Sequence, residues 1–117
     1  MTLEQIEQLC HQLPGVTQDI KWEKDLCFCV AEKMFLVLGF EENPITGSFK
    51  VPDEEFDAFC EREGFAPAPY LARYKWVAFD SLSRLQQQEW QQYITQSYNL
   101  VRAKLPKKKQ QELESKS

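Results

Sequence analysis

The sequence predicts an α+β fold, in which an antiparallel β-sheet of four to five strands packs with an N-terminal helix, a middle helix and a long C-terminal helix. Two patterns indicate this fold. Apolar residues recur at helical spacing near both ends of the chain, whereas the stretch between about residues 17 and 51 alternates or forms β-rich runs. At 117 residues the chain is the size of one ordinary domain.

The first helix is expected over about residues 3–12. Thr2 followed by Gln5 is typical of a capping box, in which each residue bonds the backbone of the other. Four apolar residues then recur at roughly helical spacing: Leu3, Ile6, Leu9 and Leu13. Pro14-Gly15 is a turn pair that prevents the helix from continuing.

The middle of the chain predicts a sheet. Ile20 and Trp22 alternate with charged neighbours, and the runs 26–30 and 34–38 are β-rich and separated by a tight connection, as in a hairpin. Residues 48–51 form a further short strand. We expect three or four of these strands to form an antiparallel meander with one face buried.

The middle helix begins at Pro52, because proline suits a first turn and the acidic residues 53–55 complement the helix dipole. Gly64 is a plausible end for it. Residues 65–70 contain two prolines, which lack the N–H donor, so this stretch is neither a regular helix nor a central strand. Residues 74–79 resume as a strand.

The last helix is the longest predicted element. Ser83 with Gln86 suggests a second capping box, and an amphipathic pattern continues to Leu105. Pro106 ends the helix. The domain is therefore expected over residues 1–106, and residues 107–117 are expected to be a basic, disordered tail, since they include a single apolar residue.

Charge is divided unevenly along the chain. The net charge is −4, yet residues 1–65 contain five Lys and Arg against fourteen Asp and Glu, whereas residues 66–117 contain nine against four. Such a split is typical of a basic face on an otherwise acidic protein, although a charged tail would explain part of it.

The sequence favours no catalytic or metal-binding group, so we expect neither an enzyme nor a cofactor. Cys27 and Cys29 form a C-x-C pair, and His11 follows Cys10, but a single histidine and one closely spaced cysteine pair fall short of a zinc site. Buried thiols and an exposed histidine are the simpler interpretation. The acid pairs 41–42 and 53–55 suit solvated charge better than general acid–base catalysis.

The segment that begins the chain, MTLEQIEQLC, has acids and no basic residues ahead of an apolar run, so it does not resemble a secretory signal. No stretch approaches the ~20 apolar residues of a membrane-spanning helix. We therefore expect a cytoplasmic protein with no membrane partner, whose four cysteines are thiols.

Basic residues near aromatic ones are the remaining candidates for a site. Phosphate recognition needs Lys and Arg away from acidic neighbours, with aromatic rings near for bases or sugars. The candidate nucleic-acid contacts are Lys33, Lys50, Arg73, Lys75, Trp76, Arg102, Lys104 and Lys107. The alternative is that Trp76 packs in the core, Arg73 and Lys75 solubilise an edge, and the lysine run is only a tail.

Several short strings in order resemble the MmcQ/YjbR family over about residues 2–109. They are Leu13-Pro14-Gly15-Val16-Thr17, Trp22, Lys33-Met34-Phe35, Ser48-Phe49-Lys50-Val51, Lys75-Trp76-Val77, Ser97-Tyr98-Asn99-Leu100-Val101 and Lys104-Leu105-Pro106-Lys107. The resemblance implies a compact α+β fold described as a double-wing arrangement, and DNA binding without a known catalytic residue set. The positions matching the family pattern that would face an anionic partner are Lys33, Lys50, Lys75 and Lys104, with Trp76 and Tyr98 matching too.

The residues and the resemblance together predict a non-enzymatic protein that binds DNA through a basic face. The hairpin tip at residues 31–33 and the end of the last helix are the expected contacts. The competing hypothesis is a module for protein–protein interaction or small-ligand binding with no nucleic-acid role, which would use an exposed sheet face or the aromatic stretch at residues 70–76.

Overall fold

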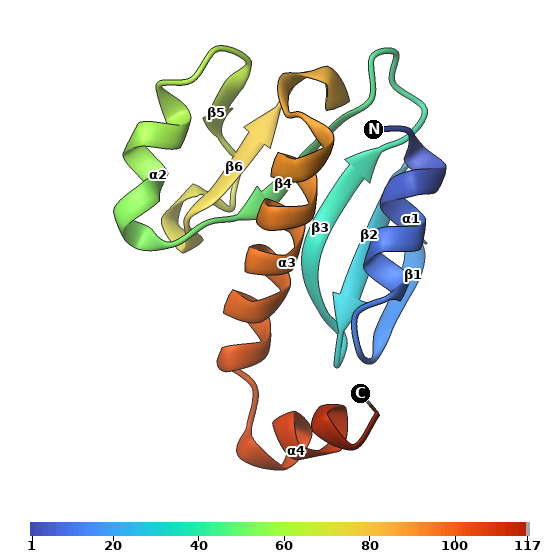
Figure 1. Cartoon of the computed structure of the whole chain (residues 1–117). Helices are drawn as coiled ribbons and strands as arrows, with labels where there is room; N and C mark the ends of the chain where they lie inside the picture. The colour runs from blue at the N-terminus through green and yellow to red at the C-terminus, as the bar shows by residue number, and fades with distance from the viewer. Residues whose placement is uncertain (117) are drawn as a thin grey trace.

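The structure is a computed structural model that describes residues 1–116, and it has the predicted α+β architecture (Figure 1). In chain order the elements are α1 (Leu3–His11), β1 (Val16–Lys21), β2 (Asp25–Val30), β3 (Lys33–Gly39), β4 (Thr46–Lys50), α2 (Asp53–Cys60), β5 (Phe65–Pro67), the 3₁₀ turn η1 (Ala72–Tyr74), β6 (Trp76–Phe79), the 3₁₀ turn η2 (Leu82–Arg84), α3 (Gln87–Ala103) and α4 (Lys107–Lys116).

The sheet is antiparallel and has six strands in the order β1-β2-β3-β4-β6-β5, rather than the four to five that the sequence predicts. The strand indicated by the alternation around Ile20 is present as the edge strand β1, although it is largely exposed and ends at Lys21, before Trp22. The strand that the sequence does not predict is β5, at the other edge. β5 contains Pro67, which an edge strand tolerates because its outer N–H needs no partner.

The helices α1, α2 and α3 pack on one face of the sheet, where rings from each of them contact Phe28 or Phe49 (Figure 1). Phe28, Leu36, Phe49 and Val77 are consecutive cross-strand partners, so their side chains point to the same face and are all buried there. α3 lies along this face, and Trp90 packs edge to face against Phe49. Lys50, one residue beyond Phe49, therefore points to the opposite face.

The capping box that the sequence predicts at Thr2 is confirmed, since Thr2 and Gln5 each bond the other's backbone N–H. The box predicted at Ser83 is wrong. Residues 82–84 form the turn η2, and Leu85 is then extended and buried, which interrupts any helix. The capping box of α3 is instead formed by Gln86 and Glu89, further along the chain than the predicted pair.

The chain continues as the helix α4 where the sequence predicts a disordered tail beyond Pro106. Gln110 N–H donates to the Pro106 carbonyl, so the proline that ends α3 lies at the start of α4. The single apolar residue of this segment, Leu113, is buried, and a Cβ on Gly15 would lie 2.3 Å from its Cδ2 atom. Contact with the turn after α1 thus anchors α4. Because this turn is distant in the sequence, the local pattern of residues 107–116 does not reveal the helix. Ser117, the last residue of the predicted tail, lies outside the described residues.

The turn between β2 and β3 places two non-glycine residues in the left-handed region, Ala31 at φ 48° and Glu32 at φ 67°. Two-residue hairpin turns of this kind prefer Asn-Gly, because side chains are strained at positive φ. We expect the double substitution Ala31→Asn/Glu32→Gly to raise the free energy of unfolding by about 1 kcal/mol, measured by urea denaturation. Glu41→Gly, at a residue without positive φ, is the control. A double variant no more stable than the wild type would contradict the prediction.

Candidate anion-binding pocket

Three lysines from distant parts of the sequence line one hollow, here called the lysine pocket, of about 590 Å³. It lies where β3 begins, β4 ends and β6 begins, beside the last turn of α3, at the lower end of the sheet in Figure 1. Its lining consists of Lys33, Met34, Lys50, Leu71, Tyr74, Trp76, Val101, Lys104, Leu105 and Pro106. No Asp or Glu is among these residues, so the pocket is cationic with apolar walls.

Lys50 is the least accessible of the three lysines, with 8% of its surface exposed. It is the last residue of β4, opposite Trp76 of β6, and its ammonium group donates a hydrogen bond to the Tyr74 carbonyl. Burial lowers the pKa of the Lys50 ammonium, and the nearby charge of Lys104 lowers it further, while Asp53 opposes the shift. An anion bound in the pocket would offset both the cost of burying the Lys50 charge and its repulsion by Lys104.

Lys33 and Lys104 are exposed and lie on different walls of the pocket. Lys33 begins β3 directly after the strained turn, and Lys104 is the C-terminal cap of α3. Within residues 1–116, no ion pair involves Lys33, Lys50 or Lys104. The side-chain amide of Gln110 donates to the carbonyl of Ala103, the last residue of α3, and to that of Leu105 just beyond it.

Two aromatic residues border the lysines. Trp76 is only 5% exposed, so it forms part of the pocket wall rather than a free ring, whereas Tyr74 is 48% exposed at the rim. Arg73 fixes the Tyr74 ring: its guanidinium carbon lies 4.8 Å from the ring centre, and its Nη2 donates to the Tyr74 hydroxyl at 2.6 Å. The rim therefore presents an aromatic ring held in one orientation.

The structure thus brings together Lys33, Lys50, Trp76 and Lys104 of the eight residues predicted from sequence. The other four do not line the pocket. Arg73 supports its rim through Tyr74, and the Lys75 ammonium lies 5.0 Å from the ring centre of Phe56. Arg102 lies near the buried Tyr98, where its charge opposes the rise in the Tyr98 pKa caused by burial, and Lys107 is exposed at the start of α4. Tyr98 itself donates to the Pro14 carbonyl at 2.6 Å, a contact that ties α3 to the turn after α1.

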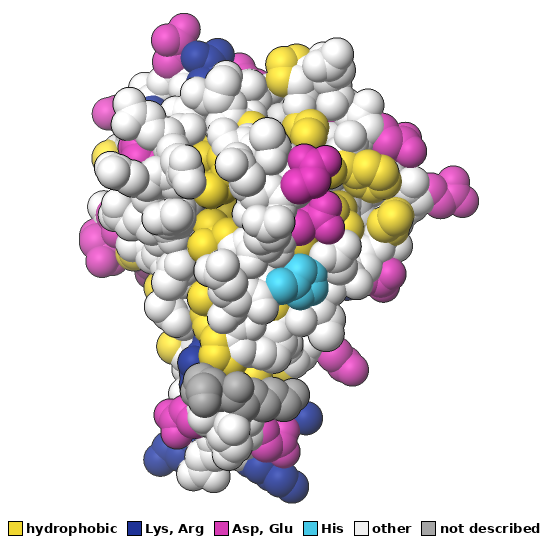
Figure 2. All heavy atoms as spheres, turned by 45° about the vertical axis from the view of Figure 1, so that its right-hand side comes forward, with side chains coloured by type: hydrophobic (Ala, Val, Ile, Leu, Met, Phe, Trp, Pro, Cys, Tyr) yellow, Lys and Arg dark blue, Asp and Glu magenta, His cyan; other side chains and the backbone are white. Residues whose placement is uncertain are grey.

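Figure 2 shows how charge is distributed on one side of the molecule. Most of the visible Lys and Arg side chains lie at the lower end, over α4, together with some acidic ones, whereas acidic side chains dominate the upper part. The basic residues of α4 in this region are Lys107, Lys108 and Lys109, of which Lys109 pairs with Glu112 at 3.8 Å. The C-terminal part of the sequence therefore places several lysines at the end of the fold where the lysine pocket lies.

Three of the four cysteines are buried, and all four are free thiols. Burial raises the pKa of Cys10 to about 12 and that of Cys27 to about 11, so both are protonated thiols at neutral pH. His11 Nε2 lies 2.6 Å from the Gln18 side-chain oxygen. In the described part of the chain, no three His, Cys, Asp or Glu residues are grouped in a way that would hold a metal ion.

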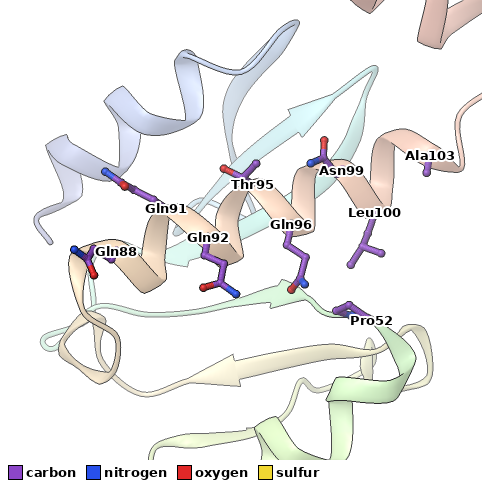
Figure 3. A pocket seen from close by; sticks show the side chains of 9 residues that line it. All are labelled: Pro52, Gln88, Gln91, Gln92, Thr95, Gln96, Asn99, Leu100 and Ala103. Carbon is purple, nitrogen blue, oxygen red and sulfur yellow. The ribbon is translucent and has the colours of Figure 1, made fainter.

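A second hollow, of about 740 Å³, runs along the outer side of α3 (Figure 3). Its lining is uncharged and rich in amides: Pro52, Gln88, Gln91, Gln92, Thr95, Gln96, Asn99, Leu100 and Ala103. The Gln96 amide donates to Glu55 at 3.2 Å, while its buried oxygen lacks a hydrogen-bond partner. Without a charged group this groove offers no means of attracting an anion, so the lysine pocket is the better candidate site.

Sequence reasoning missed the apolar walls of the pocket, above all Met34, Leu71, Val101 and Leu105. Met34 and Val101 lie within β3 and α3, whereas Leu71 and Leu105 lie in the segments just outside η1 and α3, and an apolar residue at any of these positions is ordinary. Only the strand register and the end of α3 bring them beside the lysines, so no local signal marks them as part of a site.

Comparison with known proteins gives a family and a fold. The YjbR family model matches residues 11–100. Two solved structures are similar: the Deinococcus radiodurans protein DR2400, described with the domain DUF419, and a protein from Pseudomonas syringae. The first is 22% identical with a TM-score of 0.86, covering 96% of this chain and 87% of that one, and the second is 19% identical with a TM-score of 0.69, covering 86% and 98%. Among curated proteins, none matches this chain.

Proposed function

The chain belongs to the YjbR family, and we propose that it is a non-enzymatic protein that binds DNA phosphates through the lysine pocket and the basic surface around it. The observation that supports the proposal is the convergence of Lys33, Lys50 and Lys104 in one pocket with no carboxylate in its lining. The lining also lacks His and Cys, so it offers no imidazole base and no thiol nucleophile.

Lys104 and Lys50 repel each other, since burial and then the charge of Lys104 lower the pKa of the Lys50 ammonium. This repulsion costs free energy when the pocket is empty. A bound phosphate oxygen would replace repulsion by attraction and would accept charge-assisted hydrogen bonds, which are stronger than neutral ones. A cationic cluster without acidic partners is therefore better explained by an anionic ligand than by stability of the fold.

Flanking residues extend the basic surface beyond the pocket. Arg73 and Lys75 bracket the Tyr74 rim, and Lys107 and Lys108 are exposed on α4. In duplex DNA, each phosphate contact contributes a slope of about −0.9 to the logarithmic dependence of affinity on salt. Three or four contacts would give a slope of about −3, so binding should be measurable at low salt and weaken strongly as salt rises.

The double variant Lys33→Gln/Lys104→Gln tests this proposal. Loss of two exposed contacts, each contributing somewhat less than 1 kcal/mol, should weaken DNA binding about tenfold. Fluorescence anisotropy with labelled duplex and single-stranded 20-mers, at salt concentrations from 50 to 200 mM, would measure the change. Both lysines are exposed, so the fold should be retained.

Lys21→Gln/Lys24→Gln is the matched control, because it removes the same charge at the turn between β1 and β2, outside the lysine pocket. We expect this control to bind DNA nearly as the wild type does. An equal loss in both variants would show nonspecific charge attraction, and no wild-type binding at about 50 mM salt, where phosphate contacts are strongest, would refute DNA binding.

The apolar walls of the pocket favour a second function, binding of a small ligand by a module with no nucleic-acid role. Most small-molecule sites are concave and largely apolar, with a few placed polar groups, and have volumes of roughly 300–1,000 Å³. The lysine pocket, at about 590 Å³, fits this description. A thermal shift with anionic metabolites and none with DNA would support this alternative over the first.

A further inference from the structure

We infer that the lysine pocket binds a phosphomonoester joined to a planar ring, either the phosphorylated terminal nucleotide of a nucleic-acid strand or a free mononucleotide. This inference deepens the proposed function and rests on it where the ligand is a strand end. The terminal phosphate would enter the pocket, whereas the internal phosphates of a strand would lie against the basic surface around it.

Concavity is the first argument for a terminal phosphate. The amine of Lys50 lies in the pocket wall, bonded to the Tyr74 carbonyl and with little of the residue exposed. Only a group that projects into the hollow reaches it. A phosphate within a continuous strand is linked on both sides and stays at the level of the backbone, whereas a terminal phosphate is free on one side.

Charge is the second argument. A phosphomonoester carries about −1.5 to −2 charges at pH 7 and three strong acceptor oxygens, compared with a single charge for an internal phosphodiester. The three lysines that line the pocket come from different elements, β3, β4 and the end of α3, and the charge of Lys104 is near enough to act on Lys50. Three donors around one hollow suit a group with three acceptor oxygens.

The rim supplies the third argument. Tyr74 is half exposed, and Arg73 holds its ring by a hydrogen bond and by a cation–π contact. A nucleotide base stacks favourably on an aromatic ring of this kind. Met34 and Leu71 line the same pocket and provide apolar surface for the ring of a nucleotide. A volume of about 590 Å³ has room for one nucleotide rather than a length of strand.

The test compares matched probes on the intact chain. A labelled single-stranded oligonucleotide would be prepared with a 5′-phosphate, with a 3′-phosphate and with neither, and binding would be measured by anisotropy. We expect one phosphorylated form to bind about tenfold more tightly than the unphosphorylated strand, because an additional charge-assisted contact forms in the pocket. Adenosine monophosphate should compete for this probe, whereas adenosine should not.

The variant Lys50→Met tests whether the preference for a phosphorylated strand end depends on the lysine pocket. We expect this variant to lose the preference for a phosphorylated end while retaining the affinity of the unphosphorylated strand, whereas Lys24→Met, at the turn between β1 and β2, should keep both. Thermal unfolding of each variant checks the fold, and Lys33→Gln/Lys104→Gln gives a second route to the same loss through exposed residues.

The outcomes separate this inference from the proposed function. Equal binding of all three strands, without competition by the mononucleotide, would overturn the inference and leave DNA binding intact. Binding of the mononucleotide without any strand would support the pocket ligand and refute DNA binding. No binding of any probe, or a preference that persists in both Lys50→Met and Lys33→Gln/Lys104→Gln, would also overturn the inference.

Discussion

Substitution of Phe49 by alanine is expected to lower the free energy of unfolding by about 3–5 kcal/mol. Phe49 is fully buried and lies at the centre of an aromatic cluster. Its ring contacts five others, at centroid distances between 5.7 and 6.5 Å: Phe59, Phe65, Phe79, Trp90 and Tyr93. These rings come from α2, β5, β6 and α3, so one side chain joins four elements to β4.

The expected loss is large compared with the total stability of an ordinary domain, about 5–15 kcal/mol. Urea denaturation would measure it. Phe49→Leu, which keeps most of the volume, should cost less than Phe49→Ala, and Phe56→Ala, at a half-buried position outside the cluster, should also cost less. A loss below about 1 kcal/mol for Phe49→Ala would show that the cluster is not the centre of the core.

The second large effect is expected at Ser97, where alanine should lower the free energy of unfolding by about 2–4 kcal/mol. Ser97 is fully buried on α3, and its hydroxyl donates to the Phe35 carbonyl at 2.6 Å while accepting from the Lys50 N–H at 3.0 Å. Pairing of β3 with β4 stops one residue earlier, at Leu36 and Phe49. The hydroxyl therefore occupies the place of the next rung of the ladder.

Alanine at position 97 would leave a buried carbonyl and a buried N–H without partners, which is more costly than losing one exposed hydrogen bond. Chemical denaturation would show the loss, and Ser48→Ala, at a half-buried residue of β4, should change stability by less than about 0.5 kcal/mol. Because Ser97 fixes the backbone of Lys50, Ser97→Ala should also weaken anion binding in the pocket. Equal stabilities for Ser97→Ala and the wild type would refute this role.

The sequence predicts the elements that depend on local patterns. The capping box at Thr2, the hairpin of β2 and β3, and the long α3 each carry a signal in neighbouring residues, and the structure has all three. β5 and α4 lack such a signal, since β5 is a short edge strand that contains Pro67 and α4 depends on contact between Leu113 and Gly15. These elements form because of partners distant in sequence, β6 for β5 and the turn after α1 for α4, which local propensity does not report.

The candidate site was predictable in composition but not in arrangement. Lys33, Lys50, Trp76 and Lys104 stand out in the sequence as basic or aromatic residues at the ends of expected elements. Their convergence depends on the register of β3, β4 and β6 and on where α3 ends. Lys75 and Arg102 are also candidate contacts in the sequence, but the tertiary structure places Lys75 beside Phe56 and Arg102 near Tyr98.

The exposed edge strand β1 has a consequence for solubility. One side of Val16–Lys21 pairs with β2, and its other side leaves a row of backbone donors and acceptors without a neighbouring strand. Ile20 is 54% exposed on this edge, a combination that in isolation would favour intermolecular strand pairing. Asp19 and Lys21 flank it and act as gatekeepers, because a second strand adding there would remove water from both charges. The charged residues that alternate with Ile20 in the sequence thus keep the open end of the sheet from pairing with another molecule.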